Sequence, residues 1–110
     1  DVVPRDEHAA SHDWSPAPDP ASLRERVWEH VGATRAAVVN ERLGLRVEVT
    51  SSLPRLWQWV DPAPRFYALA LEPANCSVLG RAHDRAEGLL PVLQPGEERF
   101  TNVVVRVEVT

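Results

Sequence analysis

From residue 35 onward, hydrophobic and polar side chains alternate with a period of two, the pattern of half-buried β-strands. The apolar residues of 45–50 all fall on one face of such a strand, and its charged residues fall on the other. The apolar segment 36–39 precedes it, and residues 40–44 connect the two. Because this connection ends in Gly44, which accepts a positive φ, we expect residues 36–50 to form an antiparallel hairpin.

Three further strands are expected, over residues 56–60, 66–72 and 99–110. Pro73 lacks a backbone N–H and is predicted to end the pairing of the second of these. The stretch 74–97 reads as irregular, with turns at Gly80, Gly88 and Pro95-Gly96.

The first part of the chain is less regular. Residues 1–22 contain four prolines and predict an extended, Pro-rich connector, followed by a β segment over 23–110. Residues 22–31 fit two readings. Ser22 and Glu25 have the spacing of a helix capping box, whereas 27–31 also fits a short strand, and we favour the strand.

The pentapeptide Arg-Val-Glu-Val-Thr occurs at 46–50 and again at 106–110. Five residues are too few to establish a repeat, and half-buried antiparallel strands converge on such patterns. The expected strands together predict a mostly β protein, an antiparallel β-sandwich or part of one.

Composition narrows the possible partners. With 110 residues, 44% apolar and 25% charged, the chain suits one globular domain. The net charge is −4 and the 12 basic residues, all arginine, are scattered, which argues against nucleic acid and anionic membranes as partners. No apolar run approaches the roughly 20 residues that span a bilayer. The chain has one cysteine, Cys76, and no visible signal peptide, so we expect a cytoplasmic location.

Glu72 is the first candidate for chemistry. In the strand 66–72, Tyr67, Leu69 and Leu71 share one bulky face, while Ala68 and Ala70 share the other with Glu72. Two alanines beside a carboxylate leave room for a ligand over the sheet. Pro73 restricts Glu72 to extended backbone, which fixes the direction of its side chain. The alternative is a solvated glutamate at the end of a strand.

Other candidates give weaker signals. Trp57 and Trp59 face the same way and suit either the apolar face of a sugar ring or a core. His8 and His12 have helical spacing for a metal, but Ala9 stands where the zinc-protease motif needs glutamate, so a solvated loop is expected. The remaining histidines, His30 and His83, have no partner by spacing, and Cys76 has no neighbouring base.

Several motifs in the second half resemble one known family. These are Tyr-Ala-Leu-Ala-Leu-Glu-Pro-Ala-Asn at 67–75, Gly80-Arg81, Leu-Gln-Pro-Gly-Glu at 93–97, Leu53-Pro54 and Trp57-Gln58-Trp59. In this order they resemble the C-terminal end of the aldose 1-epimerase (galactose mutarotase-like) family, nearest a poorly characterised bacterial branch. The clear resemblance covers residues 35–110 and weakens toward residue 2.

The resemblance implies the C-terminal part of an antiparallel β-supersandwich that binds a small sugar and interconverts its α and β anomers without a cofactor or metal. It assigns the general base to Glu72, and Asn75, Arg81, Trp57 and Trp59 are candidates for the sugar surface. The family's acid histidine has no counterpart among His8, His12, His30 and His83. We therefore expect a segment of a longer protein, an expectation that the absence of methionine supports.

Two other functions remain open. One is a carbohydrate-binding β-sandwich that uses the tryptophan face without proton transfer. The other is an interaction module whose unpaired strand edges recruit a partner strand, either from missing chain or from a second copy.

Overall fold

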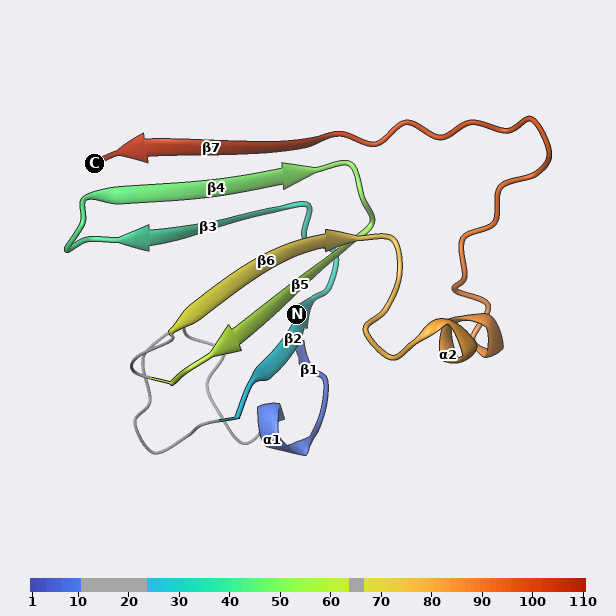
Figure 1. Cartoon of the computed structure of the whole chain (residues 1–110), viewed down its shortest axis with the longest axis horizontal. Helices are drawn as coiled ribbons and strands as arrows, with labels where there is room; N and C mark the ends of the chain where they lie inside the picture. The colour runs from blue at the N-terminus through green and yellow to red at the C-terminus, as the bar shows by residue number, and fades with distance from the viewer. Residues whose placement is uncertain (11–23, 64–66) are drawn as a thin grey trace.

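The computed structural model describes residues 1–10, 24–63 and 67–110, and its two antiparallel sheets form an open β-sandwich (Figure 1). One sheet has four strands in the order β1-β2-β5-β6, and the other has three in the order β3-β4-β7. The fold class expected from the alternation of the sequence, a mostly β antiparallel sandwich, is confirmed. The elements are β1 (Val2–Pro4), α1 (Glu7–Ala10), β2 (Arg26–His30), β3 (Arg35–Asn40), β4 (Leu45–Ser51), β5 (Arg55–Asp61), β6 (Ala68–Ala74), α2 (Arg81–Ala86) and β7 (Val103–Val109).

The expected hairpin is β3–β4, paired from Asn40 opposite Leu45 to Arg35 opposite Thr50. Gly44 has a φ of 64°, as the connection requires. The open question over 22–31 is resolved for the described residues, because Arg26–His30 is a strand that pairs with both β1 and β5. Ser22, the proposed helix cap, lies outside the described residues.

Three boundaries differ from the sequence prediction. Pro73 does not end the pairing of β6, because it lies opposite Leu56 and the strand continues to Ala74. Since β6 is at the edge of its sheet, a proline is tolerated there. The stretch 74–97 is not wholly irregular, because it contains α2, and the last strand is shorter than expected, beginning at Val103.

The first ten residues join the four-stranded sheet. Val3 lies opposite Glu29, so β1 forms an edge strand beside β2. The helix α1 follows, and Ala9 is fully buried against Trp28 and Val60. The proline run at 16–20, which suggested the connector, lies outside the described residues. Neither described helix is long and apolar enough to cross a membrane.

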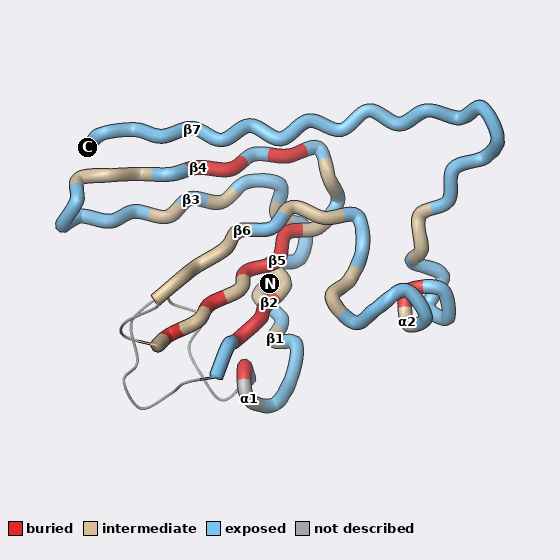
Figure 2. The backbone as a smooth tube through the Cα atoms, in the orientation of Figure 1, coloured by how far each residue is buried: buried red, intermediate tan, exposed pale blue. Residues whose placement is uncertain are grey.

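The core is small. Trp28 and Val60 are each 3% exposed, and Tyr67 and Leu69 pack against them, as alternation along β6 predicted. Between the sheets lies an apolar cavity of about 360 Å³, lined by Val38, Val47, Val49, Leu69, Leu71 and Val105. The radius of gyration is 15.9 Å, whereas about 13 Å is typical of a compact chain of this length. The sandwich is therefore open rather than closed, and Figure 2 shows β7 exposed along its whole length.

Candidate functional site

The site is built on the face of the four-stranded sheet that is turned away from the other sheet, which we call the outer face. Leu69 and Leu71 line the cavity between the sheets, so Ala70 and Glu72 project to the opposite side. Glu72 is exposed and lies directly opposite Trp57 on β5, while Ala70 lies opposite Trp59. Because directly opposite residues of an antiparallel pair share a face, the two tryptophans, the alanine and the carboxylate form one surface.

Trp57 is flanked by a carboxylate on each side. Glu29 lies opposite it on β2 and Glu72 lies opposite it on β6, so the three residues form a row across the sheet. Arg55, two residues before Trp57, forms an ion pair with Glu29 with 3.2 Å between Nε and Oε1. Its guanidinium carbon also lies 5.9 Å from the centre of the Trp57 ring.

The two carboxylates therefore differ in their partners. Arg55 neutralises Glu29, whereas Glu72 makes no ion pair with any of the residues described. Of the two carboxylates, Glu72 is therefore the one that a ligand on the outer face could contact without breaking an ion pair among the described residues.

The two tryptophans differ in exposure. Trp57 is 5% exposed, and its indole N–H donates a 3.2 Å hydrogen bond to the carbonyl oxygen of Cys76, which follows β6. Trp59 is half-buried, and its indole N–H donates a 2.6 Å hydrogen bond to the carboxylate of Glu25. Only Trp59 therefore offers part of its ring to a ligand, and Trp57 supports the surface from beneath.

The loop after β6 is fixed by a buried carboxylate. Asp84 on α2 is 1% exposed and accepts hydrogen bonds from the backbone N–H of Ser77 (2.9 Å) and from its hydroxyl (2.5 Å). These bonds from Ser77, together with His83, lower the pKa of Asp84 below its usual 3.8. The segment that carries Asn75 and Cys76 is thus tied to α2.

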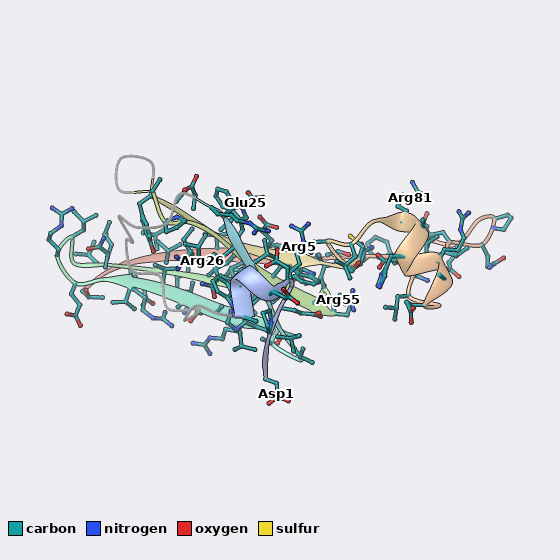
Figure 3. The ribbon with its side chains drawn as sticks, turned by 90° about the horizontal axis from the view of Figure 1, so that it is seen from below. Asp1, Arg5, Glu25, Arg26, Arg55 and Arg81 are labelled. Carbon is teal, nitrogen blue, oxygen red and sulfur yellow. The ribbon has the colours of Figure 1, made fainter. Side chains whose placement is uncertain are left out.

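Asn75 and Arg81 lie at the end of the molecule that carries α2. Asn75 helps to line a cavity of about 400 Å³ together with Ser52, Leu53, Pro54, Leu89, Pro91, Arg99, Phe100 and Thr101. Glu72 is not among its lining residues. Arg81 is the first residue of α2 and is exposed, and Figure 3 shows it at the α2 end of the long axis, far along that axis from Glu25. The structure therefore brings Glu72, Trp57 and Trp59 together but sets Arg81 on a separate element.

His30 lies off the outer face, and His83 lies on α2. His30 shares the inner face, which is turned toward the other sheet, with Gln58, and its Nε2 is 2.7 Å from the Gln58 side-chain oxygen. His83 lies on α2, with Nδ1 3.2 Å from the Asp84 carboxylate. His12 lies outside the described residues, and Cys76 is free and exposed. Among the described residues, no group of three or more histidine, cysteine or acidic side chains could hold a metal ion.

Comparison of the sequence with models of known protein families gives a match that covers nearly the whole chain. A family model described as "Domain of unknown function (DUF4432)" matches residues 1–107. The chain belongs to the DUF4432 family. The match to DUF4432 spans both sheets, from β1 into β7, so the outer face and the α2 loop belong to the family domain. No curated protein and no solved structure matches the chain.

Three features of the candidate site were missed at the sequence level. Arg55 stands two residues before Trp57, so period-two alternation alone would have placed it on the tryptophan face. The bond between Ser77 and Asp84 had no comparable signal, because it depends on a short helix that follows a loop. The larger cavity near Asn75 likewise joins segments that are distant in sequence.

Proposed function

We propose that this DUF4432 chain carries the base of an aldose 1-epimerase-like reaction, in which the α and β anomers of a sugar interconvert on the outer face. The observation that carries the proposal is the placement of Glu72. Its carboxylate is exposed, lies opposite Trp57 and makes no ion pair with the described residues.

The surroundings of Glu72 suit a sugar ring. Ala70 and Ala68 continue its face along β6, so no bulky side chain of this strand competes for the space above them. Trp59 lies opposite Ala70 and presents part of its indole ring. An aromatic ring beside a polar group is the usual combination for a surface that recognises one face of a sugar.

In the proposed reaction, Glu72 takes the proton of the anomeric hydroxyl while an acid protonates the ring oxygen. The bond between the anomeric carbon and the ring oxygen breaks, giving the open-chain aldehyde. The aldehyde group rotates, and the hydroxyl formed from the ring oxygen attacks the opposite face of the aldehyde carbon. Its proton returns to the acid, and Glu72 returns its proton to the aldehyde oxygen, which becomes the anomeric hydroxyl again. A positioned base of this kind typically contributes about 10² to 10⁴ in rate.

The proposal assigns only the base to the described residues. His30 cannot act with Glu72, because it lies on the inner face and Glu72 on the outer face. The proposal leaves the acid to solvent or to another group of the protein.

Because the proposal assigns a base but no acid to the described residues, a second candidate function is a carbohydrate-binding β-sandwich that performs no proton transfer. The half-buried ring of Trp59 would serve such a binding surface without any acid. We also propose a cytoplasmic location, since the free, exposed thiol of Cys76 suits a reducing compartment.

The decisive experiment measures anomer exchange by nuclear magnetic resonance, with glucose and galactose as probes and the chain in catalytic amount. We expect acceleration over buffer, and loss of that acceleration in Glu72→Gln. Glu87→Gln, which removes an exposed carboxylate beyond the end of α2, is the matched control and should remain active.

The outcomes separate the two candidates. No acceleration, together with a saturable change of tryptophan fluorescence on adding sugar, would replace the isomerase by the binding protein. Full acceleration in Glu72→Gln would refute the role of Glu72. If the chain causes no acceleration and sugar causes no change of tryptophan fluorescence, both candidates are refuted.

A further inference from the structure

The strand β7 has one unpaired edge and an exposed surface. Among the described strands it pairs only with β4, and each of its seven residues is exposed. Five of these are valines, with exposed fractions from 49% at Val103 to 87% at Val109. An unpaired strand edge of this kind is a template for another strand.

The edges of the four-stranded sheet are blunted, whereas β7 is not. Pro4 lies in β1 and Pro73 lies in β6, and proline at an edge obstructs further pairing. In the three-stranded sheet the other edge strand is β3, and its residues line a cavity together with His30, Gln58, Leu69 and Leu71. β7 contains no proline.

The backbone of β7 leaves its odd-numbered residues free to pair outward. The N–H of Thr110 donates to the carbonyl of Gly44 (2.8 Å), and the carbonyl of Asn102 accepts from Ser52 (3.1 Å). Even-numbered residues therefore point toward β4. Because the direction alternates along a strand, the N–H and C=O groups of Val105, Val107 and Val109 point to the open edge.

The structure already contains an antiparallel pairing between two copies of the same short sequence, one on β4 and one in β7. The first three residues of the two Arg-Val-Glu-Val-Thr segments, on β4 and in β7, lie opposite each other. Val47 lies opposite Val107, Arg46 opposite Glu108 and Glu48 opposite Arg106. In this register the tripeptide Arg-Val-Glu is complementary to itself, because valine meets valine and each arginine meets a glutamate.

We propose that β7 pairs antiparallel with β7 of a second copy of this chain, with Val107 opposite Val107 of the partner subunit. The two three-stranded sheets then form one continuous sheet across a two-fold axis. Val105 exchanges backbone hydrogen bonds with Val109 of the partner subunit, and Arg106 faces Glu108 of the partner subunit.

Among the registers that the open edge allows, this one sets each arginine opposite a glutamate. A shift that centres the pair on Arg106 sets arginine against arginine, and one that centres it on Glu108 sets glutamate against glutamate. A shift by one residue would instead mix the valine face with the charged face. The side chains of Arg106 and Glu108 are 64% and 44% exposed, so both can reach the partner in place of the 4.0 Å ion pair that they form with each other.

The test is sedimentation equilibrium of the whole 110-residue chain with two charge reversals, Arg106→Glu and Glu108→Arg. We expect a dimer for the unmodified chain at roughly 1–100 µM, because a strand-edge interface is small. Each variant alone sets like charges opposite each other at two symmetric positions and should dimerise at least about tenfold more weakly. Arg85→Glu on α2, away from β7, is the control and should dimerise normally.

Mixing the two variants separates loss of pairing from loss of folding. In the mixed dimer, the two acidic side chains at positions 106 and 108 of one variant face the two arginines at these positions of the other, so dimerisation should return. Hydrogen exchange should also be slowed on dimerisation at the amides of Val105, Val107 and Val109 but unchanged at Val104 and Arg106. A monomer throughout this concentration range, an assembly larger than a dimer, or no recovery on mixing would overturn the proposal.

Discussion

Trp57 lies directly opposite Glu72 in the β5–β6 pair, and the two residues share the outer face although their environments differ sharply. Trp57 is 5% exposed, covered by Arg55 and bonded to the carbonyl of Cys76. Glu72 is exposed and has no ionic partner among the described residues. One member of the pair therefore supports the fold, while the other is available for chemistry.

This contrast predicts opposite effects on stability. Glu72→Gln should change the free energy of unfolding by less than about 0.5 kcal/mol, since it alters an exposed side chain. Trp57→Ala should lower it by about 3–5 kcal/mol, because a large buried ring is removed. Urea unfolding followed by circular dichroism measures both. A strongly destabilised Glu72→Gln would mean that the carboxylate has a structural role, and its activity data would then be uninformative.

Much of the fold followed from alternation along single strands. The hairpin β3–β4, the strand β5 and the inward direction of Tyr67, Leu69 and Leu71 were all predicted from period two. The prediction that pairing ends at Pro73 was wrong, because it assumed that the strand has a neighbour on both sides. The edge position of β6 is a property of the sheet order, which no local pattern encodes.

The candidate site was predictable only in part, for the same reason. The shared face of Ala70 and Glu72 follows from their spacing. That Trp57 stands beside them depends on the register between β5 and β6, and its burial depends on the loop at Cys76. The placement of Arg81 on a separate helix also required the structure, since the sequence 74–97 reads as turns.

The hairpin turn at Gly44 gives a second prediction. Gly44 has a φ of 64°, and a Cβ atom there would lie 3.2 Å from the carbonyl oxygen of Thr110. Gly44→Ala should therefore destabilise the chain by the backbone cost of about 1–2 kcal/mol, with a steric contribution added. Thermal unfolding measures the change.

Gly32→Ala is the matched control for this variant. Gly32 also has a positive φ, 77°, but a Cβ atom there meets nothing within 4 Å. It should show the backbone cost alone, so the difference between the two variants isolates the contact with the end of the chain at Thr110. Equal destabilisation of the two variants would mean that the backbone at Thr110 moves away from the added Cβ atom at no measurable cost in stability.

The link between Ser77 and Asp84 predicts a pH-dependent loop. Hydrogen bonds from Ser77 hold the pKa of Asp84 below its usual 3.8. Because the pKa is lowered by folding, the stabilisation is fully present above about pH 4 and is lost as the pH falls through the folded-state value. The amide resonance of Ser77 should therefore shift on acidification below about pH 4 in the unmodified chain.

Asp84→Asn should abolish that titration and loosen the loop at neutral pH. Ser77 donates from both its N–H and its hydroxyl to the two oxygens of Asp84, and asparagine offers only one side-chain acceptor. We expect hydrogen exchange at the Ser77 amide to accelerate in Asp84→Asn but not in Glu87→Gln, which changes an exposed residue at the end of the same helix. Because Trp57 donates to the carbonyl of Cys76 in this loop, its fluorescence should change in the same variant. Unchanged exchange and unchanged fluorescence in Asp84→Asn would show that the loop is held by its other contacts, and that Asp84 does not position the segment containing Asn75.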